Sequence, residues 1–583
     1  MKLKKLIIKN FRNFEDCSID LSNKNLIFGM NDVGKSNLIY ALRVLFEQKI
    51  RNTNLQVTDF HKQNTNNNIE ISCLFDISDD SEYSQLLIAK AESASISDDK
   101  LFKISLLAEW NNGEPIIDLQ WGTETEPMIN IPSRGVSRSL LDDIFHCIFI
   151  PSQNNINSSF KNFKKELLST HEATSSDKQI LKSISNANQD INTEISTLSS
   201  VQKMEEGINE VLSLFDQDYQ VKISPNHTFG DLHNNLELYM RDNNSSDVYP
   251  TSGDGRVRKV MYALINYLLQ NGKDSQRKIP ILLIEEPENH LFLSAQIELS
   301  KTIFSEEFSL FLFLTTHSPQ LFFRISDDAN LIRLHKENND ISTKSEYLIV
   351  PDEYKKSKNI LLENLAQCLF VDKVLLVEGE SEKLLFEWVL DSLGKDRQRI
   401  LIQPILGVHF EKYVKILVGL GIKVLIKTDN DIKRNRKSKN SDVITYSPIG
   451  YNRCINILNI ISDNPIEKID SDEKEPEELR HYIRKCYSNE IKILKNKGIY
   501  LSEVDLENDL ADSLELSNKN KFIEWLQEKK WQNMWSFINL NHNEIKEEIY
   551  TELKLINDSG NDIAQKIYDS EAFICLKALN NEV

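Results

Sequence analysis

"FGMNDVGKSNLIYAL", residues 28–42, decides the first part of the fold. It fits the pattern G-x-x-x-x-G-K-[ST] at Gly29, Gly34, Lys35 and Ser36. In this pattern the backbone N–H groups wrap a phosphate, the lysine reaches the terminal phosphates, and the serine hydroxyl can ligate Mg²⁺. An apolar run typical of a strand precedes the loop and a helical pattern follows it, which is the context the motif requires. The stretch therefore predicts an α/β nucleotide-binding domain.

A second stretch, "ILLIEEPENHL" at residues 281–291, supports this prediction. A buried-strand pattern ends in Glu285 and Glu286, of which one carboxylate can hold the Mg²⁺ shell and the next can polarise a water. The alternative is a strand that runs into a polar turn at Pro287. Together with the phosphate loop, the pair favours a nucleotide site.

Two shorter stretches fit the same site. "TSGDG", residues 251–255, places Ser252 and Gly253 just before a helical pattern, whose N-terminus can meet a phosphate. His317 ends another buried strand in "LFLTTHSP", where a lone histidine is more often structural but the position matches a γ-phosphate sensor. With Ser36 and Glu285 as the Mg²⁺ ligands, the predicted nucleotide-binding residues are Gly29, Asn31, Asp32, Val33, Gly34, Lys35, Ser36, Ser252, Gly253, Glu285, Glu286 and His317.

Length and composition set the frame. The 583 residues predict about two to four domains, and no apolar run is long enough to cross a membrane. The basic N-terminus has too short an apolar core for a signal peptide. Seven cysteines without a C-x-x-C pair argue against a zinc ribbon or a disulfide framework, so we expect a cytoplasmic protein. The net charge of -19 does not exclude nucleic acid, because phosphate binding needs only a local basic strip.

The pattern along the chain predicts four segments. Residues 1–150 are strand-rich and form the first part of the ATPase domain. Residues 151–248 are rich in Ser, Asn, Lys and Glu with helical spacing, and predict a helical insertion that is either a surface excursion or a dimerisation arm. Strand and helix alternation resumes at 249–350, and a second α/β block occupies 368–583.

The second α/β block carries an acidic cluster. "VLLVEGESEK" places Glu378 at a strand end and Glu382 in the helix that follows. "VLIKTDND" ends a later strand at Asp429 and Asp431, a pattern that in isolation is usually a turn. Because such carboxylates repel one another without a cation, the cluster predicts a Mg²⁺ or Mn²⁺ site.

A third acidic stretch, "YLSEVDLENDL" at residues 500–510, adds Asp505, Glu507 and Asp509. It is either an acidic helix start or the ligand set of a second metal, since two cations can stabilise both oxygens of a phosphodiester displacement. Lys530 can supply a cation for transition-state charge, although a surface lysine is the ordinary case. The basic run at residues 433–439 would contact DNA phosphates beside the site, and alone it would be a solvated loop.

The order of "FRNFE", the phosphate loop, "TSGDG", "IEEPE" and "TTHSP" resembles the ABC-type ATPase heads of the RecF/SMC/OLD group. In that group two heads sandwich nucleotide, and the signature loop of one head touches the phosphate held by the other. This chain has "TSGDG" in place of Leu-Ser-Gly-Gly-Gln, and Glu285 where an aspartate is usual. Nucleotide binding is therefore better supported than fast hydrolysis.

An E-G followed by D-x-D at strand ends resembles the Toprim pattern. A Toprim domain after an ABC ATPase is the OLD-family nuclease arrangement, and the whole chain resembles the Gabija-type antiphage nuclease subunits of that family. The resemblance implies a metal-dependent endonuclease that nicks or cleaves invading double-stranded DNA, is restrained by nucleotide, forms a homodimer or tetramer and works with a UvrD-like helicase subunit. The expected cofactors are Mg²⁺ or Mn²⁺ at the nuclease site and ATP with Mg²⁺ at the ATPase site.

The resemblance also places Asp505 and Lys530 in the active site. The expected catalytic residues are Glu378, Glu382, Asp429, Asp431, Asp505 and Lys530, and the expected metal ligands of the nuclease site are Glu378, Asp429, Asp431, Asp505 and Glu507.

Two other functions stay open at this point. A repair or chromosome-maintenance ATPase of RecF type would use the Toprim block only for binding and would not cleave DNA. A topoisomerase or primase also uses Toprim, but religation needs a tyrosine nucleophile, and no tyrosine is singled out here. A transporter is excluded, because membrane spans are missing and the Toprim block does not suit a transport subunit.

Overall fold

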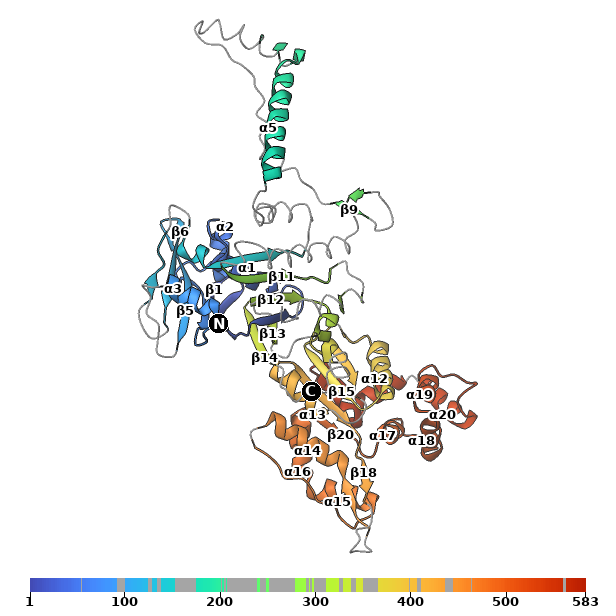
Figure 1. Cartoon of the computed structure of the whole chain (residues 1–583). Helices are drawn as coiled ribbons and strands as arrows, with labels where there is room; N and C mark the ends of the chain where they lie inside the picture. Colours follow the sequence, from blue (N-terminus) through green and yellow to red (C-terminus); the bar gives the residue numbers. More distant parts are fainter. Residues whose placement is uncertain are drawn as a thin grey trace. The chain divides into compact units, whose positions relative to one another are not determined.

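Figure 1 shows the computed structural model of the chain. The structure describes residues 1–53, 55–91, 100–123, 128–133, 138–152, 175–200, 239–241, 248–250, 278–289, 311–324, 329–336, 342–349, 365–397, 399–405, 410–435, 444–462, 464–558 and 562–582, with a few positions between them. The chain divides into two compact units, which are described separately. The first comprises Met1–Leu3, Ile39–Leu55 and Ile71–Leu314, and the second comprises Lys4–Leu38, Gln56–Glu70 and Thr315–Val583.

The first unit holds strands that the apolar runs of the sequence predict. β8 (Phe145–Ile150) pairs in parallel with β11 (Ile279–Glu285), which neighbours β12 (Phe311–Thr316). These strands are almost wholly apolar, as expected for parallel strands buried on both faces. Phe46, Phe75, Phe145 and Phe311 pack with ring centroids 5.0 to 6.4 Å apart and form part of its core.

The remaining elements of the first unit are antiparallel strands and helices. β4 (Ile69–Asp76) and β5 (Leu101–Asn111) are neighbours, and β6 (Glu114–Gly122) pairs antiparallel with β5 and with β7 (Ile129–Asn130). α5 (Ser175–Ser196) lies within the predicted helical insertion, most of which lies outside the described residues. The dimerisation role and the predicted domain bounds stay predictions.

The second unit begins with the strands around the phosphate loop. β1 (Lys2–Phe11) pairs antiparallel with β2 (Phe14–Asp20). β3 (Lys24–Phe28) pairs in parallel with β13 (Ala329–Lys336), which pairs antiparallel with β14 (Thr343–Ile349). β3 leads directly into the loop, and α1 (Lys35–Phe46) leaves it, as the motif predicts.

The predicted acidic cluster lies at one edge of a four-stranded parallel sheet in the second unit. Its order is β16 (Ile400–Pro404), β15 (Lys373–Val377), β17 (Lys423–Thr428) and β20 (Ile499–Leu501). Because parallel strands end at the same edge, the residues after β15, β17 and β20 come together there. This edge positions the candidate nuclease centre.

Helices complete this α/β block (Figure 1). α12 (Glu380–Ser392) follows β15, and its apolar face packs on helices from the end of the chain, with the Trp388 and Phe537 rings 6.3 Å apart. Near the sheet edge lie the hairpin β18 (Ile432–Arg434) with β19 (Tyr446–Pro448) and then α14 (Ile449–Ile461). The other helices are α13 (Phe410–Gly419), α15 (Pro476–Cys486), α16 (Ser488–Asn496), α17 (Leu506–Ser513), α18 (Lys519–Glu528), α19 (Lys530–Ile538), α20 (Glu547–Asp558), α21 (Ile563–Asp569) and α22 (Ile574–Leu579).

A buried arginine joins β13 to this α/β block within the second unit. The Arg333 guanidinium donates to Asp372 Oδ1 at 2.8 Å, and to the main-chain oxygens of Val371 at 3.2 Å, Gly421 at 3.2 Å and Leu420 at 3.3 Å. Its side chain is almost completely buried. The Arg333 side chain therefore makes four hydrogen bonds that link the strand beside the phosphate loop to the α/β block.

In the described part of the chain, no helix combines the length and the apolar character that crossing a bilayer requires.

Candidate functional site

The phosphate loop depends on glycine at both of its ends. Gly29 and Gly34 have φ of 147° and 100°, values that L side chains rarely adopt. A Cβ on Gly29 would lie 2.2 Å from the carbonyl oxygen of Leu334, and a Cβ on Gly34 would lie 1.9 Å from Asn13 Nδ2. The loop thus needs glycine for its conformation and for the space that its neighbours leave.

The two residues predicted to contact phosphate and Mg²⁺ differ in exposure. The Lys35 ammonium is buried in the loop and donates to the carbonyl oxygens of Gly29 at 3.1 Å and Met30 at 2.7 Å. Ser36, at the start of α1, is exposed. A phosphate would compete with these carbonyls for Lys35, whereas the Ser36 hydroxyl is accessible to a cation.

Polar side chains behind the loop hold its backbone in place. Thr343 Oγ1 and Asn13 Nδ2 donate to the carbonyl oxygen of Val33 at 2.7 and 3.1 Å. Asn37 Nδ2 donates to Asn13 Oδ1 at 2.6 Å, and Arg12 Nη1 donates to Asn37 Oδ1 at 3.0 Å. The "FRNF" stretch therefore braces the loop. The sequence showed this stretch but gave no role to its Arg and Asn.

The other predicted nucleotide contacts lie apart in the chain. Glu285 is the last residue of β11 in the first unit, and Glu286 has φ of 42° and accepts a hydrogen bond from Asn289 Nδ2 at 2.8 Å. His317 follows β12. Residues 252 and 253 lie outside the described residues. The nucleotide roles of these residues stay predictions.

Glu378 is the centre of the acidic cluster. It follows β15, and its Oε1 accepts hydrogen bonds from the backbone N–H of Asp429 at 2.9 Å, from the Thr428 hydroxyl and from Arg453 Nη1. Arg453 Nη2 also lies 3.3 Å from Asp431 Oδ2. The structure thus brings Glu378, Asp429 and Asp431 together as predicted. It adds Thr428 and Arg453, which the sequence did not single out.

The loop that carries the two aspartates is fixed through its backbone. The N–H of Asn430, between them, donates to the carbonyl oxygen of Val504 at 2.9 Å. A Cβ on Gly450 would lie 2.2 Å from the carbonyl oxygen of Asp429 and 2.7 Å from the amide nitrogen of Asp431. Glycine at the start of α14 therefore lets this helix pack directly against the loop.

The third acidic stretch also reaches the sheet edge. Asp505 is the N-cap of α17, where its Oδ1 accepts from the Asn508 amide at 2.9 Å. Glu507 is buried, and its Oε1 lies 3.4 Å from Nζ of Lys530, the first residue of α19. Asp505 therefore has the helix-start role that the sequence allowed. Lys530 lies among the carboxylates, as the resemblance implied.

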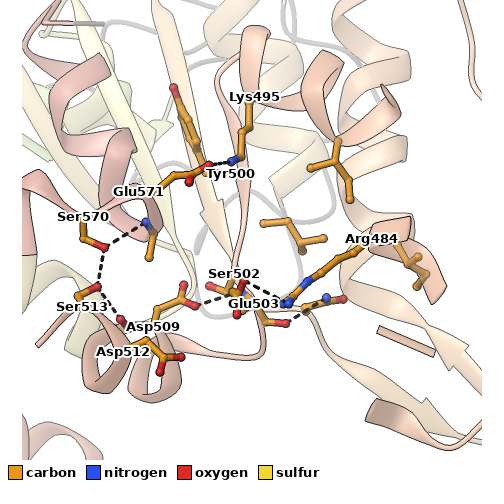
Figure 2. Close-up of a pocket in the computed structure, with 15 residues that line it drawn as sticks. Arg484, Lys495, Tyr500, Ser502, Glu503, Asp509, Asp512, Ser513, Ser570 and Glu571 are labelled. Atoms are coloured by element: carbon orange, nitrogen blue, oxygen red, sulfur yellow. Dashed lines mark hydrogen bonds and ion pairs between the residues drawn. The ribbon is translucent and has the colours of Figure 1, made fainter. Parts of the chain in front are cut away.

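Asp509 has a different role from its neighbours. Its Oδ2 accepts from Lys427 Nζ at 2.6 Å and its Oδ1 accepts from the Glu503 amide at 3.0 Å. Lys427, on β17, also donates to the carbonyl oxygen of Ala572 at 3.0 Å. Asp509 lines a cavity of about 420 Å³, and Figure 2 shows it near Glu503 and Ser513. The buried ion pair between Lys427 and Asp509 argues against Asp509 as a ligand of a second metal.

Burial and mutual repulsion shift the pKa values of the cluster. Burial, followed by the charge of Glu378 and of other nearby carboxylates, raises the pKa of Asp429 to about 9. Burial raises the pKa of Glu382 to about 7, with Glu378 and Glu507 adding to the shift. Burial alone would lower the pKa of Lys530, but the negative charge of Glu507, Asp429 and Glu382 outweighs it and raises the pKa. The site concentrates negative charge, which Lys530 and Arg453 offset only in part.

The chemistry of the donors fits a divalent cation. The cluster offers carboxylate oxygens, which Mg²⁺ and Mn²⁺ prefer, and Oε2 of the buried Glu507 has no hydrogen-bond partner. No three acidic, histidine or cysteine side chains among the described residues are arranged to hold one metal, and the Arg453 guanidinium bridges Glu378 and Asp431. Joint ligation by Glu378 and Asp431 therefore requires them to exchange this guanidinium for the cation.

Two family models match the chain. The AAA ATPase domain matches residues 1–114 and 140–322, which include the phosphate loop. The "Overcoming lysogenization defect protein-like, TOPRIM domain" matches residues 369–431, which include Glu378, Glu382, Asp429 and Asp431. The matched regions confirm the prediction of an ATPase domain followed by a Toprim domain.

Relatives extend the match over the whole chain. Endonuclease GajA of Bacillus cereus (strain VD045) is 34% identical over 599 residues, which cover 99% of this chain and 99% of the relative. The chain belongs to the GajA endonuclease family. The Old nuclease of Escherichia phage P2 is 28% identical over 236 residues, 38% of either chain. The family predicted from the sequence is thus confirmed.

The GajA family match leaves the roles of single residues as predictions. The matched Toprim segment ends at residue 431, so Asp505, Glu507 and Lys530 lie beyond it. Their place in the site rests on the contacts and charges described above. Domains of these two kinds generally use ATP and divalent metal ions, which agrees with the donor set.

Proposed function

We propose that the chain is a metal-dependent DNA endonuclease whose cleavage is controlled by nucleotide at its ATPase domain. One observation carries this proposal: the edge of the parallel sheet gathers the carboxylates of Glu378, Asp429 and Asp431 with the ammonium of Lys530. Acidic side chains that can hold a cation, next to a positive group, are what hydrolysis of a phosphodiester needs. The proposal assigns to this chain the activity that appears in the name of its relative, Endonuclease GajA.

The residues of the chain have separate tasks in this reaction. Glu378, Asp429 and Asp431, with Asp505 and Glu507 near them, would hold Mg²⁺ or Mn²⁺. When bound, the cation polarises the phosphodiester and lowers the pKa of a water. Lys530, held beside Glu507, is positioned to neutralise charge on the phosphoryl oxygens. The carboxyl of Glu382, with a pKa of about 7, can exchange a proton at neutral pH.

The phosphate loop supports nucleotide binding and suits a sensor better than a motor. Lys35 would exchange its two loop carbonyls for the phosphates of ATP, and Ser36 would ligate Mg²⁺. Glu285 and Glu286, Ser252 and His317 are the further contacts we propose. The atypical "TSGDG" loop and Glu285 favour slow turnover, which suits a sensor. The resemblance to Gabija-type nucleases supplies the sign of the effect: bound ATP would hold the nuclease off, and its depletion would release it.

The wider setting is proposed from the resemblance to Gabija-type nucleases. The substrate is double-stranded DNA of an invader, the chain forms a homodimer or tetramer, and a UvrD-like helicase subunit is its partner in the cytoplasm. The basic run that begins with Lys433 and Arg434 on β18 would face the DNA backbone, and its remainder at 436–439 lies outside the described residues.

Supercoiled plasmid with Mg²⁺ or Mn²⁺ provides the test. The wild type should nick or linearise it, while Glu378→Ala and Asp429→Ala should abolish cleavage and keep the fold, as judged by circular dichroism. Asp391→Asn is the matched control, because Asp391 is exposed on α12 and pairs with Arg397. Cleavage by either cluster variant at the wild-type rate would refute the site. A wild type that binds but never cleaves DNA would favour the RecF-like alternative.

A further inference from the structure

Two exposed tryptophans form a stacked aromatic pair on α19. Trp531 and Trp535 are four residues apart, so they share one face of the helix. Their rings are nearly parallel, with an interplanar angle of 15° and centroids 6.3 Å apart. Their side chains are 54% and 51% exposed, whereas Met534 and Phe537 on another face of the helix are buried in the core. The fold therefore does not need the exposed ring faces.

This surface begins directly beside the candidate nuclease centre. Lys530, whose Nζ lies 3.4 Å from Glu507, is the first residue of α19 and immediately precedes Trp531. A helix rises about 1.5 Å per residue, so Trp531 and Trp535 lie about 1.5 and about 7.5 Å along the axis from Lys530. Neighbouring nucleotides of a strand are about 3.4 Å apart along the duplex. A strand whose phosphate lies at Lys530 and that turns around the start of α19 would therefore bring its next bases level with the rings along the helix axis.

The chemistry of the surface fits nucleic acid. Lys529 is exposed and, with Lys530, places positive charge at the start of the helix, where a phosphate is favoured. The two ring faces are flat and apolar, and every base has a face that can stack on them. Both rings lie within the first two turns of the helix that Lys530 starts. Charge, shape and position therefore point to the DNA strand as the occupant.

We propose that Trp531 and Trp535 form a stacking platform for an unstacked base of the DNA strand next to the phosphate that is cleaved. This inference rests on the proposed endonuclease function and adds a substrate contact to it. Stacking on an aromatic side chain tolerates any base, so the platform would favour DNA with an unpaired or loosened base without reading its sequence.

DNA binding in Ca²⁺, measured by fluorescence anisotropy, tests the platform. The probes are a labelled duplex with one unpaired base and the same duplex fully paired. Trp531→Ala and Trp535→Ala should each weaken binding to the first probe by about 5-fold to about 150-fold, and the second probe should be affected less. Phenylalanine at either position should retain most of the affinity. Trp535→Leu, which is apolar but has no ring face, should behave like the alanine variant.

The matched control is Leu555→Ala, because Leu555 is 65% exposed on α20 in the same block. It should bind both probes like the wild type. Circular dichroism checks that all variants fold. Because both rings are exposed, we expect their replacement to leave the fold intact. DNA that stacks on the platform should also quench tryptophan fluorescence, and the double Trp531→Phe/Trp535→Phe variant should lose that part of the quenching.

Wild-type affinity of both alanine variants for the unpaired-base probe would overturn the inference. So would a change of oligomeric state without a change in DNA binding, because the surface would then serve a contact between copies of the chain. Failure of the proposed function looks different. In that case the wild type leaves plasmid intact in Mg²⁺ and Mn²⁺, whatever the tryptophan variants do.

Discussion

Replacing Lys427 by methionine should destabilise the Toprim block strongly without removing a metal ligand. The side chains of Lys427 and Asp509 are 4% and 0% exposed, and Nζ lies 2.6 Å from Oδ2. Methionine preserves most of the volume of the lysine stem, so the cavity contribution is small. The Asp509 carboxylate, however, remains buried without its partner, and the carbonyl oxygen of Ala572 loses a donor. Breaking a buried pair in this way costs about 3–5 kcal/mol of unfolding free energy.

Urea unfolding measures this cost, with the transition of the Toprim block fitted separately because the chain has several domains. The exposed Lys519–Asp512 pair is the control, and Lys519→Ala should cost less than about 1 kcal/mol. In the double variant Lys427→Met/Asp509→Leu no unpaired charge is left, so most of the lost stability should return.

Two results would refute the reasoning. A cost of less than about 1 kcal/mol for Lys427→Met would mean that the pair does not hold the block together. A folded double variant that no longer cleaves DNA would mean that Asp509 acts on the metal after all.

Three further outcomes are expected. Lys35→Ala should weaken ATP binding in calorimetry and make cleavage less sensitive to millimolar ATP at constant free Mg²⁺; unchanged ATP affinity would contradict the loop assignment. The pKa of Asp429 is raised from 3.8 to about 9 in the metal-free fold. Between about pH 4 and about pH 9 the folded chain therefore keeps a proton on this carboxyl that the unfolded chain loses. As the pH rises through this range, the Asp429 contribution lowers the free energy of unfolding. Cation binding should release that proton, and Mn²⁺ affinity should rise with pH toward about 9. Calorimetry in buffers of different ionisation enthalpy measures the proton release. No proton release at pH 7 would disprove the prediction. Cys486 is the exposed cysteine, and burial raises the pKa values of the other six thiols. A disulfide reagent at pH 8 should therefore modify one thiol rapidly in the wild type and none in Cys486→Ser. Two or more rapidly modified thiols would argue against this packing.

The sequence predicted the parts of the site that local pattern determines. Glu378 and Asp429 each follow an apolar run, and parallel strands end at one sheet edge, so both residues were expected at that edge. Their grouping into one site followed from the resemblance to the Toprim pattern. The phosphate loop was predictable for the same reason, because its glycines and Lys35 act within a few residues of one another. In both cases chemistry and local fold point to the same residues.

Long-range partners were not predictable in this way. Asp505, Glu507 and Asp509 look equivalent in sequence, and only the fold brings Lys427, 82 residues away, to the last of them. Arg453 lies in an otherwise largely apolar helix, and no spacing rule connects it with Glu378, 75 residues earlier. Such pairs depend on the tertiary arrangement of elements that are far apart in the sequence, and a single sequence carries no signal for that arrangement.

The joint at Arg333 has a consequence for how such chains can be recombined. Three of its four contacts are with main-chain oxygens, of Val371, Leu420 and Gly421, which any residue at those positions would supply. Only the pairing with Asp372 depends on side-chain identity. These three hydrogen bonds should therefore survive substitution at the three positions as long as the backbone path is kept. A chimera that retains this arginine–aspartate pair and the same backbone path should keep all four hydrogen bonds of the joint when the nuclease block of a relative replaces its own.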